Sequence, residues 1–137
     1  MINSFKIRVI DRDPDCLKID ISSSNGRFSG AAEIYAGLHQ PGEFIRAIKG
    51  FPKNLADERK YVIGTKNKNN AAGFCSLRIY CRNASGHIAI DLEFEDDNRS
   101  DAAKFTLFPV LASDIDQLVV QLKLMDDGRL QEARLGA

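Results

Sequence analysis

Two carboxylates, Asp91 and Glu93, stand two residues apart in the segment IDLEFED, a spacing at which two acids can act together. In an extended strand, residues i and i+2 share a face, so the two carboxylates would lie side by side. Such a pair can hold a cation or act as a general acid and base. The alternative is a structural ladder in which Arg78 and Arg82, on the preceding strand, oppose them. Because both strands carry opposite charges on their outward parity, the sequence favours the ladder.

Other reactive side chains lack the partners that a reaction needs. His39 and His87 are the only histidines, and the sequence shows no positioned acid or nucleophile for either. The chain contains no GxSxG, P-loop, GxGxxG or HExxH motif. Cys16, Cys75 and Cys81 form no CxxC pair, so we expect buried thiols in a reducing cytosol and not a disulfide or metal site. The sequence therefore predicts no cofactor, no bound metal and no enzymatic activity.

Two tyrosines, Tyr35 and Tyr80, fall on the outward parity of expected strands, and Phe74 lies on the same parity as Tyr80. Exposed aromatic side chains among arginines and acids are typical of a protein-binding patch. The alternative is that the sheet curls and buries them, and the interior of a curled sheet can hold a small apolar ligand.

Charge is distributed unevenly along a chain whose formal net charge is zero. Residues 1–82 hold 14 Lys and Arg against 8 Asp and Glu, whereas residues 83–137 hold 5 against 11. Nucleic-acid-binding proteins usually present a basic surface, so nucleic acid is not an expected partner. The densest acidic block supplies the charged candidates for partner binding: Asp91, Glu93, Glu95, Asp96 and Asp97.

These candidates are positioned by a predicted hairpin over residues 73–96. Apolar residues alternate with polar ones from Cys75 to Cys81 and again from Ile88 to Phe94, on either side of a turn at 83–86. Period-two alternation on both arms indicates one buried face and one wet face. We therefore expect Ile79 and Ile90 to point into the core.

The rest of the chain has the patterns of five further strands and two helices. Gly30 and Ala32 are small for a core-facing row that also includes Phe28, which predicts that a helix packs closely over them. Ser113 is expected to cap the second helix, and residues 129–137 are predicted either to add a helical turn or to fray. The strands are expected near 4–10, 16–21, 27–36, 59–65 and 103–110, and the helices near 40–50 and 113–125.

A chain of 137 residues is long enough for one core, so residues 1–137 are predicted to form a single domain. Short turns favour antiparallel pairing. The expected fold class is α+β, an antiparallel meander of about seven strands in the order βββαββββα with two helices on one face. So large a sheet must curl, split in two or leave a face exposed. With no apolar run of signal-peptide or membrane-span length, a cytoplasmic protein without a membrane partner is expected.

The stretches RFSGAAEIYAGLHQPGEFIRAIKGFPKN and GFCSLRIYCRNASGHIAIDLEFE, followed by a terminal helix, resemble small bacterial immunity proteins of wall-associated polymorphic toxins. The resemblance covers roughly residues 27–125, and it implies a protein that neutralises a toxin by steric and electrostatic occlusion. It transfers no functional residue, because its matching positions belong to the scaffold: Phe28, Gly30, Phe51, Pro52 and Gly86.

The first functional hypothesis is therefore a non-enzymatic cytoplasmic binding protein. Glu95, Asp96 and Asp97 would steer association electrostatically, with Tyr35 and Tyr80 as anchors. The second hypothesis is a small-ligand-binding domain or enzyme with a pocket inside a curled sheet. The third is an oligomer subunit that pairs through a bare edge strand.

Overall fold

The computed structural model of the chain describes residues 3–66, 73–97 and 101–136. Eight strands and two helices follow one another along this part of the chain. In chain order they are β1 (Ser4–Arg12), β2 (Leu17–Ser24), β3 (Ser29–Ala36), α1 (Gln40–Ile48), β4 (Glu58–Gly64), β5 (Phe74–Cys81), β6 (Ile88–Glu95), β7 (Ala102–Val110), α2 (Ala112–Asp126) and β8 (Glu132–Gly136).

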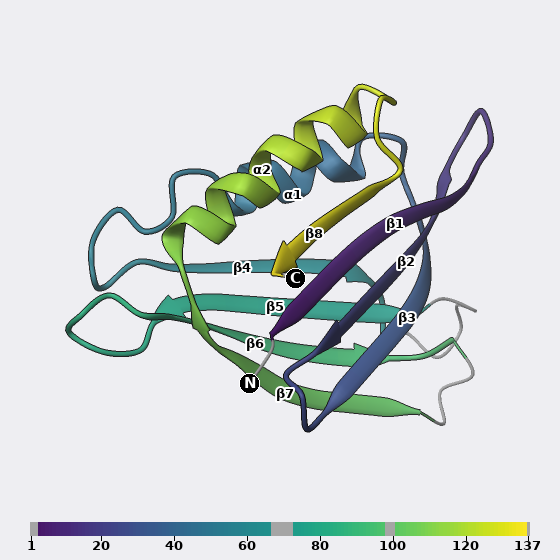
Figure 1. Cartoon of the computed structure of the whole chain (residues 1–137). Coiled ribbons are helices and arrows are strands. Elements are labelled where there is room, and N and C mark those ends of the chain that lie inside the picture. The colour runs from purple at the N-terminus through teal and green to yellow at the C-terminus, as the bar shows by residue number, and fades with distance from the viewer. Residues whose placement is uncertain (1–2, 67–72, 98–100, 137) are drawn as a thin grey trace.

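The strands form two four-stranded antiparallel sheets. Sheet A has the order β3-β2-β1-β8, and sheet B has the order β4-β5-β6-β7. The strands of sheet A run across those of sheet B, and both helices lie together at one side of the molecule (Figure 1). The α+β class and the antiparallel pairing are confirmed, whereas the single sheet of about seven strands is wrong. The sheet splits in two, which is one of the three ways in which so many strands can hide their apolar face.

The eighth strand consists of residues that the sequence assigns to a helical turn or a frayed end. It pairs with β1, so that Leu135 stands opposite Phe5 and Ala133 opposite Ile7. Both Ala133 and Leu135 are buried. The side-chain amide of Gln121 on α2 accepts a hydrogen bond from the backbone N–H of Arg134 and donates one to its carbonyl, at 2.8 and 2.9 Å. Helix α2 thus covers the outer edge of β8.

One core joins the two sheets and the two helices. Ile79 and Ile90 are each 2% exposed, so the parity predicted for the central hairpin is confirmed. Phe28 is an exception, at 63% exposure, because it belongs to the turn before β3, where the side chain of Asn25 accepts a hydrogen bond from its backbone N–H. The space between the sheets is filled by apolar side chains of this core.

Gly30 lies where the two sheets come close together. A Cβ atom on Gly30 would stand 2.7 Å from Cδ2 of Phe94 on β6 and 2.9 Å from Cβ of Ala103 on β7. The prediction that a close neighbour demands small residues here is confirmed, but the neighbour is the opposite sheet and not a helix. Alternation along β3 fixes which side chains point inward, and it does not identify the element that they meet.

The helices pack against each other, and each contacts a different sheet, α1 against β4 and α2 against β8. The ring of Phe44 on α1 stacks on that of Tyr61 on β4, with centroids 4.3 Å apart. The carboxylate of Asp126 on α2 accepts a hydrogen bond from the backbone N–H of Gly42 at 3.2 Å. The predicted N-cap of α2, Ser113, is wrong. The N-cap is Leu111, two residues earlier, and the Asp114 carboxylate accepts a hydrogen bond from its backbone N–H.

Candidate functional site

The outer face of sheet B carries four of the predicted partner-binding residues: Tyr80, Asp91, Glu93 and, at the end of β6, Glu95. Strand register arranges this face in rows that cross all four strands. One row consists of Lys60, Arg78, Asp91 and Thr106, and the next consists of Val62, Ser76, Glu93 and Lys104. The odd-numbered residues of β6 point outward here because Ile90, Leu92 and Phe94 point into the core.

Asp91 is the centre of a hydrogen-bond network on this face. Its carboxylate accepts hydrogen bonds from the guanidinium of Arg78 at 3.1 Å, the hydroxyl of Tyr80 at 3.2 Å and the hydroxyl of Thr106 at 2.7 Å. The guanidinium of Arg78 also lies over the ring of Tyr80, 4.2 Å from its centroid, and donates to Glu58. This hydrogen bond lowers the pKa of the Glu58 carboxyl. The network holds Arg78 and Tyr80 in one arrangement.

The predicted ion-pair ladder is confirmed for one rung and wrong for the other. Arg78 pairs with Asp91, as the alternation of the two strands predicts. Arg82 instead lies over the ring of Phe108, 4.8 Å from its centroid, because the turn at 83–86 follows it directly and places it beyond the last pair of the hairpin. Glu93 pairs with Lys66, and this hydrogen bond raises the pKa of Lys66.

A hollow of about 300 Å³ lies between the two rows, where the small side chain of Ser76 leaves space among longer neighbours. Within the part of the chain that the structure describes, Lys60 and Lys104 form no ion pair, although both line the hollow. The lining residues are Lys60, Val62, Ser76, Arg78, Asp91, Leu92, Glu93 and Lys104. Sequence reasoning did not find this hollow, because it depends on register across four strands.

Tyr35 does not join Tyr80. It lies on the outer face of sheet A, is 60% exposed and has the ammonium of Lys18 at 5.6 Å from its ring centroid. Tyr80 is half-buried on sheet B. The parity of both tyrosines is as predicted, but parity cannot tell that their strands belong to different sheets. The two predicted anchors are therefore separate features of the surface.

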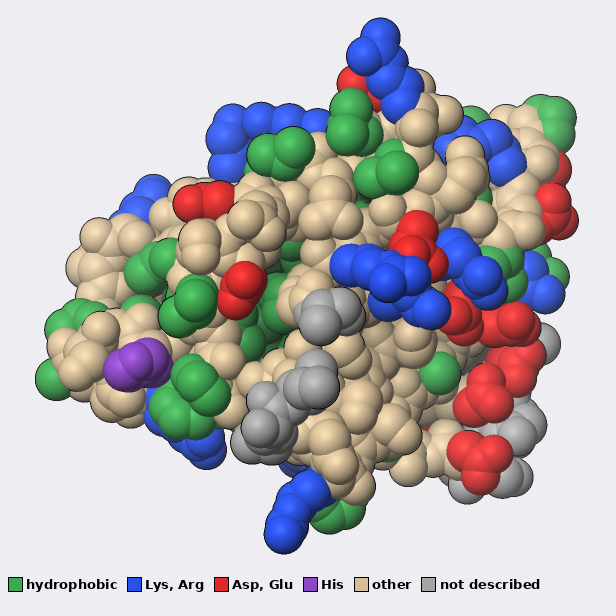
Figure 2. Space-filling model, in the orientation of Figure 1, with side chains coloured by type: hydrophobic (Ala, Val, Ile, Leu, Met, Phe, Trp, Pro, Cys, Tyr) green, Lys and Arg blue, Asp and Glu red, His purple; other side chains and the backbone are tan. Residues whose placement is uncertain are grey.

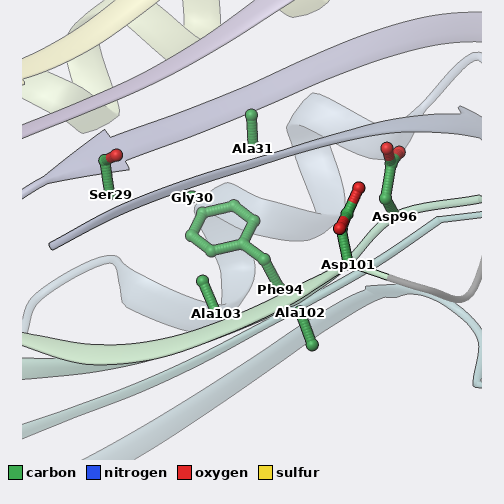
Figure 3. A pocket seen from close by; sticks show the side chains of 8 residues that line it. All are labelled: Ser29, Gly30, Ala31, Phe94, Asp96, Asp101, Ala102 and Ala103. Atoms are coloured by element: carbon green, nitrogen blue, oxygen red, sulfur yellow. The ribbon is translucent and has the colours of Figure 1, made fainter.

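The other two acidic candidates, Asp96 and Asp97, lie just beyond the end of β6. Glu95 is the last residue of the strand, and Asp96 and Asp97 follow it. Asp96 lines a groove of about 280 Å³ beside Gly30 and Phe94, and Figure 3 shows its carboxylate at one end of the groove together with that of Asp101. The full lining is Ser29, Gly30, Ala31, Phe94, Asp96, Asp101, Ala102 and Ala103.

A separate hollow of about 210 Å³ lies near this groove, and Asp96 and Asp97 line it together with Asp20 of β2 and Glu33 of β3. We call the set Asp20, Glu33, Asp96, Asp97 and Asp101 the acidic edge. Figure 2 shows acidic side chains gathered along the right-hand edge of the view. Asp20 and Glu33 were missed in the sequence because they stand more than sixty positions before Asp96. Their own pairing across β2 and β3 is the only part that hairpin register could have indicated.

The two histidines and the three cysteines lie apart from the sites described above. The ring of His87 is within hydrogen-bond distance of the side chain of Asn83, and His39 is the N-cap residue of α1, without a side-chain cap hydrogen bond. All three cysteines are free thiols, but the prediction that they are buried is confirmed only for Cys75, since Cys16 and Cys81 are partly exposed. Burial raises the pKa of the Cys75 thiol, and a hydrogen bond to Asp13 raises that of Cys16. Among the described residues, no group of three or more His, Cys, Asp or Glu could hold a metal ion.

Comparison of the chain with protein-family models, with curated proteins and with solved structures finds no match. Neither helix within the described residues is long and apolar enough to cross a membrane.

Proposed function

We propose that this chain is a non-enzymatic binding protein that docks a partner protein on the outer face of sheet B. The observation that supports this most is the fixed arrangement of Arg78 and Tyr80 around Asp91. Arg and Tyr are the residue types that most often dominate the energetics of protein interfaces. Side chains that are already ordered lose less conformational entropy on binding. A stacked and hydrogen-bonded pair is therefore well suited to be an anchor.

The composition of this face also suits a protein partner. Neither helix covers it, since α1 and α2 contact β4 and β8 from the core side, where Phe44, Ile48 and Leu122 are buried. Val62 is 53% exposed there, next to charged residues of both signs. A mixture of an aromatic anchor, apolar surface and a polar rim is the usual anatomy of a protein interface.

The partner that we propose is a bacterial toxin domain, which the chain would neutralise in the cytoplasm by occluding it. This part of the proposal rests on the resemblance of residues 27–125 to immunity proteins of wall-associated polymorphic toxins. Free thiols are compatible with a reducing compartment. The acidic edge would face a cationic toxin during approach.

The proposal predicts that the gene immediately upstream encodes a toxin domain, and the test uses that domain as the partner. A different kind of gene at this place would contradict the toxin hypothesis. We expect the purified chain to bind that domain and to protect cells that express it. Tyr80→Ala and Arg78→Ala should each weaken binding by about tenfold or more, because each removes part of the anchor. The measurements are Kd by calorimetry and cell survival, with the melting temperature as a check on folding.

Tyr35→Ala is the matched control, since it removes the same kind of side chain from the outer face of sheet A. It should leave Kd unchanged. If the upstream domain does not bind at all, the toxin hypothesis is wrong. If it binds and folded Tyr80→Ala and Arg78→Ala variants retain the original Kd, the outer face of sheet B is not the docking face.

A further inference from the structure

The charges around the hollow at Ser76 are unequally neutralised. Every acid that lines it is engaged, since Asp91 accepts three hydrogen bonds and Glu93 pairs with Lys66. The guanidinium of Arg78 is likewise shared between Asp91 and Glu58. Lys60 and Lys104 are the two lining cations that form no ion pair within the described residues.

These two lysines come from opposite edges of sheet B, Lys60 from β4 and Lys104 from β7, yet both line the same hollow. The long, flexible stems of lysine allow both ammonium groups to lean over the space above Ser76. Beside them, the exposed side chain of Val62 provides apolar surface. The hollow therefore combines apolar surface with positive charge at its rim.

We infer that this hollow receives an acidic side chain of the partner protein, with its methylene stem against Val62 and its carboxylate between Lys60 and Lys104. A volume of about 300 Å³ is ample for one such side chain. The carboxylate would form charge-assisted hydrogen bonds with one or both ammonium groups, which are stronger than bonds between neutral groups. Arg78, held by Asp91, would limit how far the guest can move along the strand.

This inference rests on the proposed function, because it requires the outer face of sheet B to be the docking face. It adds to that function the chemical identity of one contact, an acidic side chain of the partner between Lys60 and Lys104. A guest of the opposite charge is disfavoured, because a lysine or arginine in the hollow would meet two unpaired cations, and its potential partners Asp91 and Glu93 are already engaged.

The experiment measures Kd and dissociation rates with the toxin domain encoded immediately upstream. Lys60→Glu combined with Lys104→Glu should weaken binding by about tenfold or more, mainly through faster dissociation, because the guest carboxylate then meets like charges. Ser76→Leu should weaken binding to a similar extent by filling the hollow, without changing the charge. Lys123→Glu is the matched control, since Lys123 is an exposed lysine of α2 on another surface, and it should leave Kd unchanged.

A charge swap identifies the guest. Single Asp or Glu to Lys changes on the toxin domain should include one that restores binding to the chain with Lys60→Glu and Lys104→Glu. If Tyr80→Ala weakens binding while Ser76→Leu and the double lysine variant do not, the docking face stands and the acidic guest is ruled out. If none of these changes affects Kd, both the docking face and the guest are wrong.

Discussion

At Gly30 a single hydrogen atom in place of a side chain allows the two sheets to approach. A Cβ atom there would stand closer to Phe94 and Ala103 than such atoms come in proteins. Both neighbours are held in place, since Phe94 is fully buried and Ala103 belongs to the adjoining strand. The absence of a side chain at this position is thus a requirement of the sandwich and not of a turn.

Gly30→Ala is therefore expected to destabilise the fold by about 1–3 kcal/mol, the usual cost of forcing an extra methyl group into a packed core. The measurement is the denaturant midpoint at constant m-value. Gly37→Ala is the matched control, because a Cβ atom at Gly37 meets no atom within 4 Å, and it should be neutral or slightly stabilising. Equal midpoints for the two variants would show that the sheets can separate at Gly30 without cost.

For single residues, the sequence predicts well whether a side chain faces the core or the surface, but it predicts poorly which residues that side chain contacts. Ile79 and Ile90 are buried and Asp91 faces outward because alternation is a local property of a strand. The partner of each outward residue depends on register, which is why Arg78 pairs with a carboxylate as expected and Arg82 does not. The prediction that Phe28 faces the core is wrong for a different reason. Phe28 precedes β3, so the alternation of that strand does not apply to it.

At the level of helices and strands, the ion pair between Arg59 and Asp57 stabilises the connection from α1 to β4. The guanidinium of Arg59 donates two hydrogen bonds to the carboxylate of Asp57, each at 2.9 Å, and another to the carbonyl of Lys49 at 3.0 Å, just after α1 ends. Asp57 also accepts the backbone N–H of Lys53 at 2.9 Å. Arg59 thus connects the start of β4 with the end of α1, and the Asp57 carboxylate connects Arg59 with the loop at Lys53.

The hydrogen bonds from Arg59 lower the pKa of Asp57 below its ordinary value of 3.8. Because the folded-state pKa is the lower one, the stabilisation is complete above about pH 4 and is lost as the pH falls through the folded-state value. Asp57→Asn should therefore lower the melting temperature at pH 7, and the difference from the unchanged chain should shrink as the pH is lowered towards 3. Melting curves across this range check the expectation. A difference that is constant with pH would mean that the charge of Asp57 does not matter.

Element types were largely predictable, and their assembly was not. Both helices have amphipathic stripes and end before glycines, Gly50 and Gly128, which have positive φ angles of 75° and 76°. The strand β8 is only five residues long and its apolar residues are Ala133 and Leu135. So short a pattern is ambiguous until β1 and Gln121 offer it hydrogen-bond partners.

For the whole molecule, alternation cannot distinguish one curled sheet from two sheets packed face to face, since both bury the same side of every strand. The same ambiguity explains why Tyr35 and Tyr80 were expected on one surface. The acidic edge arises only in the assembled molecule, where β2 and β3 bring Asp20 and Glu33 beside Asp96 and Asp97. The acidic block at the end of β6 is thus part of a larger negative surface.

The acidic edge, together with the neighbouring Glu95, leads to a prediction about the rate of association. Glu95→Gln, Asp96→Asn and Asp97→Asn together should slow association with the upstream toxin domain several-fold at low salt, because long-range attraction is weakened. The effect should fade as salt shortens the range of the interaction to a few ångströms near 1 M. Dissociation should change little, since Glu95, Asp96 and Asp97 lie outside the Asp91 network. Stopped-flow measurements over a range of salt concentrations test all three statements.

The control must remove the same charge elsewhere, because any loss of three carboxylates alters the net charge. Glu43→Gln, Asp116→Asn and Asp127→Asn neutralise exposed acids of the two helices, in the first turn of α1, near the start of α2 and at its C-cap, and none of them lines the acidic edge. If steering is local, this triple variant associates nearly as fast as the unchanged chain and keeps its salt dependence. If both triple variants slow association equally, net charge is responsible and the acidic edge has no steering role.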